Sequence, residues 1–275
     1  MRRKRYGLYD KGNARTYNGG MASADSLDLN EYCLSGGRVV QTGPAAWRLE
    51  LPAGPGGSYR LAQLDDYRKL ARRAFPWRPP VTLSMKARAS AKSLPGTWGC
   101  GLWNDPFGMG VAQGGGLRLP ALPNAAWFFF ASPPNYLSLG DDLPAQGALA
   151  ATFRSPRWPS PLLLLGAPLL SLSLLPPAMR WLRRWARRIV RQDAVDLPVD
   201  PTEWHDYALE WGPEQVTFRL DGEALLATEI VPAGPLGLVL WVDNQYAALP
   251  PDGRLRYGTL SNPQPAWIEI EIAAA

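Results

Sequence analysis

WHDYALEWGPEQVTFRLDGEALL, residues 204–226, is the stretch that decides the fold. Its first eight residues alternate, so that one face of an extended chain holds His205, Tyr207, Leu209 and Trp211 and the other holds Trp204, Asp206, Ala208 and Glu210. The second half is a hairpin pattern, because the Asp221-Gly222 pair favours the positive φ of a tight turn. Antiparallel strands joined by short turns predict a two-sheet sandwich.

Further strand-like runs surround this hairpin, at 38–41, 46–51, 58–62, 81–90, 96–105, 125–132, 237–245 and 267–272. The chain has 275 residues, of which 46% are hydrophobic, and its 28 prolines and 27 glycines punctuate short apolar runs. This composition favours an all-β domain over a helical bundle. We therefore predict an N-terminal arm over residues 1–34 and an all-β, two-sheet antiparallel sandwich over residues 35–275.

The hairpin region also carries a family resemblance. Residues 204–226 resemble the strand pair near the end of the catalytic domain of family 16 glycoside hydrolases, the laminarinase and lichenase type of the concanavalin A-like superfamily. GTWGCGLWNDPF, residues 96–107, is similar to the tryptophan-bearing cleft strand of these enzymes. The resemblance covers residues 35–135 and 204–275 and implies a concanavalin A-like jelly roll with a sugar-binding cleft.

The chemistry of that family does not follow from the resemblance. A retaining glycosidase needs two carboxyl groups about 5 to 5.5 Å apart, and family 16 carries them in a Glu-x-Asp-x-x-Glu run on the strand after the tryptophan strand. The corresponding stretch here, NAAWFFFASPPN at 124–135, contains no acid. Whether the protein is an enzyme is therefore left open. An active hydrolase would need an unrelated pair of acids, such as Asp66 and Asp105.

The cleft itself is predicted from residues that share a face of two strands. Trp103 and Asp105 lie beside two glycines on the first, and Trp241 and Asp243 lie on the second, followed by Tyr246. The full set of predicted ligand-binding residues is Gln63, Asp65, Asp66, Trp103, Asn104, Asp105, Phe128, Phe130, Trp241, Asp243, Gln245 and Tyr246. Phenylalanine on the floor favours a hydrophobic ligand or a largely apolar substrate over a hydrated polysaccharide. We therefore predict that the cleft binds a glycan, glycolipid or other amphipathic molecule. Sandwich tryptophans are often core residues, and loop acids are often exposed, so both alternatives stay open.

Residues 136–203 are more than one sandwich connection needs, and we predict that they form an insertion. Leu162 to Leu175 is apolar but is shorter than the roughly 20 residues that span a bilayer. An amphipathic helix follows over about 177–192, with tryptophan, leucine and isoleucine in one stripe and arginine in the other. This pattern is typical of a helix that lies on a membrane surface. The predicted membrane or partner contacts are Trp181, Arg183, Arg184, Trp185, Arg187 and Arg188.

Other interpretations of this helix remain. The apolar stripe packs on the sandwich in one of them, and the insertion is a protein interface with a vestigial cleft in another. Nucleic acid is the least favoured partner, because the neighbouring leucines make no phosphate contact. The net charge of +5 is concentrated here, with seven arginines and no acid from Arg157 to Arg191.

The rest of the composition argues against a cofactor. One histidine, His205, and two cysteines, Cys33 and Cys100, have no spacing typical of zinc or redox sites. The basic N-terminus, MRRKRYGLYDKGN, is not followed by the apolar segment of a signal peptide. We therefore expect no metal or cofactor, and a cytoplasmic protein that is peripheral to the membrane if the helix binds lipid.

Overall fold

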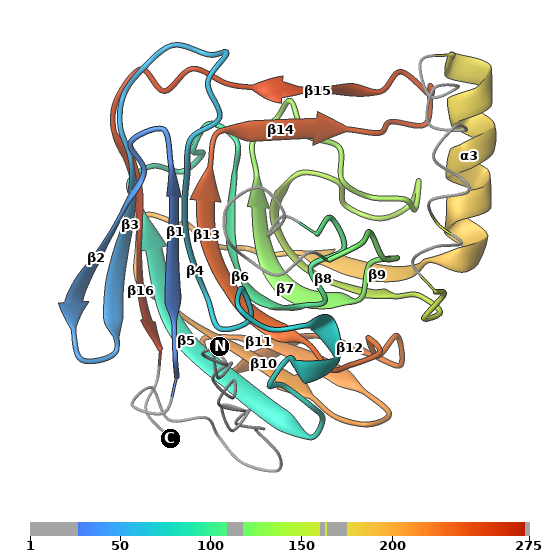
Figure 1. The fold of residues 1–275 in the computed structure, drawn as a ribbon, viewed down its shortest axis with the longest axis horizontal. Helices are drawn as coiled ribbons and strands as arrows, with labels where there is room; N and C mark the ends of the chain where they lie inside the picture. The colour runs from blue at the N-terminus through green and yellow to red at the C-terminus, as the bar shows by residue number, and fades with distance from the viewer. Residues whose placement is uncertain (1–26, 109–117, 160–162, 164–174, 273–275) are drawn as a thin grey trace, which may run out of the picture.

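The computed structural model describes residues 27–108, 118–159, 163 and 175–272. They form two seven-stranded antiparallel sheets, the two-sheet sandwich that the sequence predicts (Figure 1). Sheet A has the strand order β1 (Asn30–Leu34), β4 (Leu61–Asp65), β13 (Gly237–Asp243), β6 (Thr97–Trp103), β7 (Ala125–Ala131), β8 (Gly147–Arg154) and β9 (Arg191–Asp196). Sheet B has the order β12 (Glu223–Thr228), β11 (Val216–Leu220), β10 (His205–Trp211), β5 (Val81–Ala89), β16 (Ala266–Ile272), β3 (Ala46–Leu51) and β2 (Arg38–Gly43).

Smaller elements complete the fold. β14 (Gln245–Ala248) pairs with β15 (Arg256–Thr259), and η2 (Arg72–Ala74) is a single 3₁₀ turn. The helix α3 (Pro176–Ile189) stands at the end of the molecule where β9 lies, and β14 and β15 reach toward it (Figure 1).

The stretch at 204–226 behaves as its pattern predicts. Tyr207, Leu209 and Trp211 of β10 are buried in the core. The turn between β11 and β12 has φ of 49° at Asp221 and 85° at Gly222, the left-handed region that Asp-Gly tolerates well. The prediction of an antiparallel two-sheet sandwich is confirmed.

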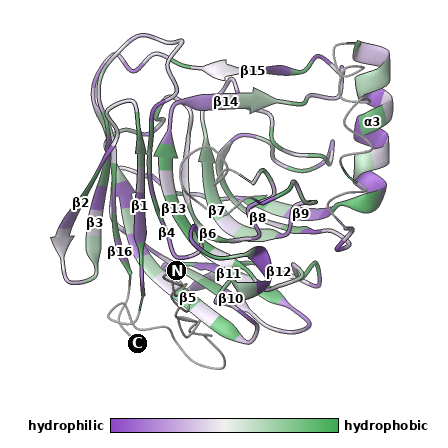
Figure 2. Ribbon diagram, in the orientation of Figure 1, coloured by the Kyte–Doolittle hydropathy of each residue, from purple (hydrophilic) through white to green (hydrophobic). Residues whose placement is uncertain are grey.

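The core lies between the two sheets. Phe128 of β7 packs against Tyr207 of β10 and Phe218 of β11, with ring centroids 5.0 and 5.3 Å apart. Phe130 stacks on Trp98 of the neighbouring strand at 3.6 Å. Figure 2 shows the hydrophobic residues gathered on β13 and β7 in the middle of sheet A. The inner face of sheet A is therefore committed to the core, and only its outer face is available for a ligand.

Three predicted boundaries differ from the structure. Residues 30–34, predicted as the end of the arm, form β1 and pair with β4, while residues 1–26 lie outside the described part of the chain. The predicted insertion, 136–203, contributes two strands of sheet A, β8 and β9, besides α3. The predicted helix at 177–192 ends at Ile189, because Arg191 already pairs with Arg154 in the sheet.

Candidate functional site

The outer face of sheet A carries an aromatic cleft built around two glycines of β6. Gly99 lies between Trp241 of β13 and Phe129 of β7, and Gly101 lies between Val239 and Trp127. A Cβ atom at Gly99 would come within 2.7 Å of the Trp241 ring, and one at Gly101 within 2.5 Å of Trp127. The glycines therefore allow the large rings of the flanking strands to close over β6, as the sequence predicts for space beside an indole.

These rings form one continuous cluster. Trp127 lies 5.9 Å from Trp241, 5.4 Å from Phe129 and 6.0 Å from Trp103, measured between ring centroids. Phe129 also lies 5.2 Å from Trp241. The tilted arrangements are those that aromatic quadrupoles favour. The cluster forms a firm apolar wall.

The cluster borders a cavity of about 430 Å³. Aromatic and aliphatic side chains make up most of its wall, and polar groups are few. The lining residues are Tyr59, Leu61, Gln63, Thr97, Trp103, Phe107, Trp127, Phe129, Asn135, Leu137, Val239, Trp241, Asp243, Gln245, Tyr246 and Ala247. An apolar hollow with a few fixed polar groups is the usual form of a small-ligand site.

Asp243 provides the polar end of the cavity. Its Oδ1 accepts hydrogen bonds from the Thr97 hydroxyl at 2.8 Å and from the backbone N–H groups of Thr97 and Gln245, and its Oδ2 accepts one from the Tyr59 hydroxyl at 3.2 Å. Burial raises the pKa of the Asp243 carboxyl to about 7, although these donors favour the charged form. Burial and the neighbouring Asp243 also raise the pKa of Tyr59.

The remaining polar groups are held in place by hydrogen bonds. Trp241 donates its indole N–H to the Thr97 hydroxyl at 3.0 Å, which links the aromatic wall to Asp243. Asn135 is bonded to the backbone of Gly96 and Ala247. Because these side chains are fixed before a ligand arrives, little ordering remains to oppose binding.

The structure brings half of the predicted ligand-binding residues together. Gln63, Trp103, Trp241, Asp243, Gln245 and Tyr246 all line the cavity. Phe128 and Phe130 do not, because β7 presents these side chains to the core and presents Trp127 and Phe129 to the cleft. The alternation of side chains along β7 predicts two faces, but the strands that pair with it and pack on it decide which face points outward.

The predicted acids outside the cavity have structural partners. Asp65 accepts hydrogen bonds from Gln63 and from Arg68, and Asp66 accepts one from the Trp77 indole at 2.5 Å. Asp105 is buried against Arg118 at 2.8 Å. Asn104 joins its own loop to Asn124 and Leu122. Neither Asp66 nor Asp105 lines the cleft, so the structure does not bring this pair together there.

The other lining residues are outside the predicted set: Tyr59, Leu61, Thr97, Phe107, Trp127, Phe129, Asn135, Leu137, Val239 and Ala247. Trp127 and Phe129 lie on the strand that the sequence does assign to the cleft, so the missing information was the orientation of its side chains. Leu137 lies at the start of the predicted insertion, and Asn135 lies just before it, in the loop between β7 and β8. No sequence pattern indicates where such a loop folds.

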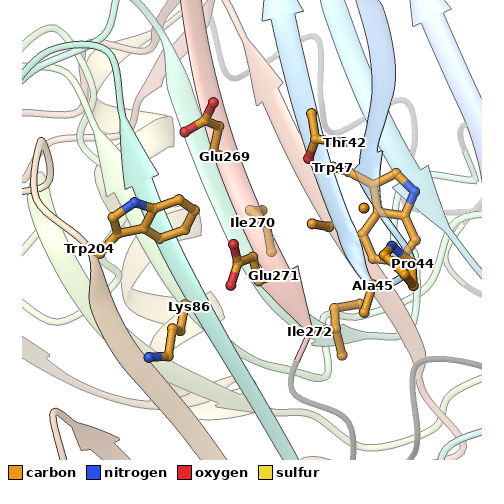
Figure 3. A pocket seen from close by; sticks show the side chains of 12 residues that line it. Thr42, Pro44, Ala45, Trp47, Lys86, Trp204, Glu269, Ile270, Glu271 and Ile272 are labelled. Carbon is orange, nitrogen blue, oxygen red and sulfur yellow. The ribbon is translucent and has the colours of Figure 1, made fainter.

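A second hollow, of about 610 Å³, lies on the outer face of sheet B. Figure 3 shows Glu269 and Glu271 of β16 between Trp204 on one side and Trp47 and Pro44 on the other. Glu269 is ion-paired with Arg88 at 2.7 Å and with Arg48 at 3.5 Å. Glu269 and Glu271 both line this hollow, but the charge of Glu269 is balanced by its arginine partners.

No group of three His, Cys, Asp or Glu side chains among the described residues is arranged to hold a metal ion. Within the same part of the chain, no helix is long and apolar enough to cross a membrane.

The comparisons with known proteins concern the fold. No family model and no curated protein matches the sequence. An endo-β-galactosidase from Clostridium perfringens that releases GlcNAcα1-4Gal superposes with a TM-score of 0.49 and 12% identity, over 91% of this chain and 60% of that one. A Bacillus licheniformis β-glucanase has a TM-score of 0.43 at 11% identity, over 92% and 97%. A legume lectin-like domain from Entamoeba histolytica has a TM-score of 0.44 at 9% identity, over 90% of each chain.

Proposed function

We propose that the protein binds an amphipathic ligand, a glycan-bearing lipid or a comparable molecule, in the aromatic cleft of sheet A and does not hydrolyse it. The observation that carries this proposal is the side of β7 that faces the cleft. It presents Ala125, Trp127, Phe129 and Ala131, and none of these is a carboxylic acid.

The absence of paired acids argues against hydrolysis at this site. The resemblance to family 16 places the catalytic carboxyl groups on the strand after the tryptophan strand, and β7 is that strand here. Among the described residues that line the cavity, Asp243 is the one carboxylic acid. A retaining or an inverting mechanism requires two, one to donate a proton and one to attack or to activate water.

The distribution of polar groups supports a ligand with two kinds of surface. The walls formed by Trp127, Phe129 and Trp241 suit acyl chains and the C–H faces of sugar rings. Asp243 and Gln245 at one end offer hydrogen-bonding partners for hydroxyl groups. A purely polar oligosaccharide would place hydroxyl groups against this aromatic wall, where they find no hydrogen-bonding partner.

Binding of n-octyl β-D-glucoside, with methyl β-D-glucoside as the sugar-only probe, tests the proposal. Isothermal titration calorimetry below the critical micelle concentration is expected to detect binding of octyl glucoside. Methyl glucoside is expected to bind with a far lower affinity. Phe129→Ala removes an aromatic side chain from the cavity wall and is expected to lower the affinity for octyl glucoside about tenfold. Trp204→Ala, on the opposite sheet, is the matched control and is expected to leave the affinity unchanged.

Two other functions make different predictions. A hydrolase that used Glu269 and Glu271, an acid pair that lines one hollow, would lose the release of nitrophenol from nitrophenyl β-glycosides in Glu271→Gln. The Arg88 and Arg48 partners of Glu269 argue against this role. An assembly partner with a vestigial cleft would bind neither glucoside and would co-purify in a stable complex.

A further inference from the structure

The helix α3 exposes a surface of two tryptophans and four arginines. Trp181 and Trp185 are 51% and 47% exposed, unusually open for indoles, and their ring centroids are 6.2 Å apart. We call this the Trp/Arg surface, and it consists of Arg180, Trp181, Arg184, Trp185, Arg187 and Arg188. Figure 2 shows hydrophilic and hydrophobic residues side by side on the helix.

Contacts on the opposite side of α3 hold the helix with its two tryptophans facing outward. Met179 and Val190 are buried against the domain, and Arg183, which is 3% exposed, lies between them. The Arg183 guanidinium donates to the carbonyl groups of Ser138 and Leu249 at 2.6 and 2.7 Å and to Asp141 at 2.7 Å. Rolling the helix to bury its tryptophans would break all three hydrogen bonds. Arg183, predicted as a membrane or partner contact, is therefore an anchor of the helix.

The charge of the Trp/Arg surface is strongly positive. α3 itself contains no acid. A recess of about 220 Å³ beside the helix is lined by Arg180, Arg183, Arg184 and Arg187 together with Asp141 and Pro251. Asp141 is paired with Arg183 and Arg187, which leaves Arg180, Arg184 and Arg188 without a carboxylate partner among the described residues.

We propose that the Trp/Arg surface docks the protein on an anionic lipid bilayer. Indole rings favour the headgroup level of a bilayer, where an apolar face and a polar N–H are both satisfied. Arginines on the same surface pair with lipid phosphates. The 14 residues of α3 extend about 21 Å, too short to span the hydrocarbon core, so the helix lies along the membrane.

The geometry favours lipid over nucleic acid. Trp181 and Trp185 are tilted by 32° and contact one another on adjacent turns of the helix, so no slot is open between them for a base to stack. This proposal does not depend on the ligand of the aromatic cleft. An amphipathic ligand would, however, be delivered from such a surface.

Flotation with vesicles tests the docking. Wild-type protein is expected to float with equimolar phosphatidylcholine and phosphatidylglycerol vesicles and to stay at the bottom of the gradient with phosphatidylcholine alone. Arg184→Glu/Arg188→Glu is expected to lower the partition coefficient at least about 30-fold, because each arginine near an anionic bilayer contributes about 1 kcal/mol to binding. Trp181→Ser/Trp185→Ser is expected to lower it by about tenfold or more.

Matched variants control for charge and for tryptophan content. Arg38→Glu/Arg73→Glu makes the same change in net charge at exposed positions away from α3, and Trp158→Ser/Trp204→Ser removes two exposed tryptophans elsewhere. Both are expected to float like wild type. Equal flotation of all variants, or no flotation of wild type, overturns the proposal. Preferential binding of single-stranded DNA over anionic vesicles, lost in Arg184→Glu/Arg188→Glu, would replace lipid with nucleic acid as the partner.

Discussion

At the residue scale, Asp243 combines two roles at the polar end of the cleft. Its two carboxyl oxygens accept hydrogen bonds from Thr97, Gln245 and Tyr59, which ties β13 to β6 and to the loop before β4. Burial at the same time raises its pKa to about 7. Near neutral pH a small change in proton activity therefore changes the charge of the cavity.

The raised pKa of Asp243 predicts a pH-dependent stability. The folded state keeps a proton on this carboxyl up to about pH 7, whereas the unfolded chain loses it near the ordinary value of 3.8. The folded state binds more protons in this interval, so the free energy of unfolding is expected to fall as the pH rises from about 4 to about 7 and to change little above it. Urea unfolding across this range measures the slope.

Substitution of the carboxyl group isolates this contribution. Asp66 has a pKa raised to about 7 by burial and adds a slope of the same sign. Asp243→Asn is therefore expected to reduce the slope and not to remove it, whereas Glu214→Gln, at an exposed position, leaves it unchanged. A slope that Asp243→Asn does not alter would show that this carboxyl titrates normally.

Predicted residues line the cavity where one face of a strand carries both an indole and a carboxyl group. Trp103 beside glycines, and Trp241 beside Asp243, indicate an open face because a carboxyl group is costly in a closed core. On β7 both faces are aromatic, so the sequence does not distinguish the core residues Phe128 and Phe130 from the cleft residues Trp127 and Phe129. Pairing with β6 and packing on Tyr207 decide this.

At the element scale, α3 shows why an amphipathic pattern does not identify its own inner side. The tryptophans have the largest aromatic side chains of the helix, yet they face outward, and Arg183 faces inward. The buried Arg183 guanidinium donates hydrogen bonds to the carbonyl groups of Ser138 and Leu249 and to the carboxylate of Asp141. These acceptors come from distant parts of the sequence and have no local signal.

The anchor role of Arg183 predicts a local loss of stability. Arg183→Met is expected to raise the hydrogen-exchange rate of the α3 amides about 100-fold, because two buried carbonyl groups lose their donor and Asp141 loses a partner. Arg184→Met, one residue along on the exposed side, is the control and is expected to change exchange by less than about threefold. Equal protection of α3 in both variants would contradict the assignment of Arg183 as the anchor.

At the scale of the whole molecule, the sequence was sufficient for the fold class but not for the full sheet. β8 contains three alanines and β9 reads RQDAVD, so both are poorer in β-branched and aromatic residues than the strands that the sequence predicts. Both are stabilised by pairing with β7 and with each other. The predicted insertion is consequently part of sheet A. The loop that leads into it contributes Asn135 and Leu137 to the wall of the cleft.

Sheet A thus joins an aromatic cleft on its outer face to a basic helix beyond β9. We propose that this cleft binds the apolar part of an amphipathic ligand and leaves the ligand intact. Both properties follow from the aromatic face of β7 and the single acid, Asp243, among the described residues of the cavity wall.

The most direct test is the affinity of hexyl, heptyl and octyl β-D-glucosides, measured by calorimetry below their critical micelle concentrations with free glucose assayed afterwards. Each added methylene that enters the cleft contributes about 0.8 kcal/mol, so Kd is predicted to fall about fourfold per step, with no glucose released. Equal Kd values along the series, or release of glucose, would contradict the account.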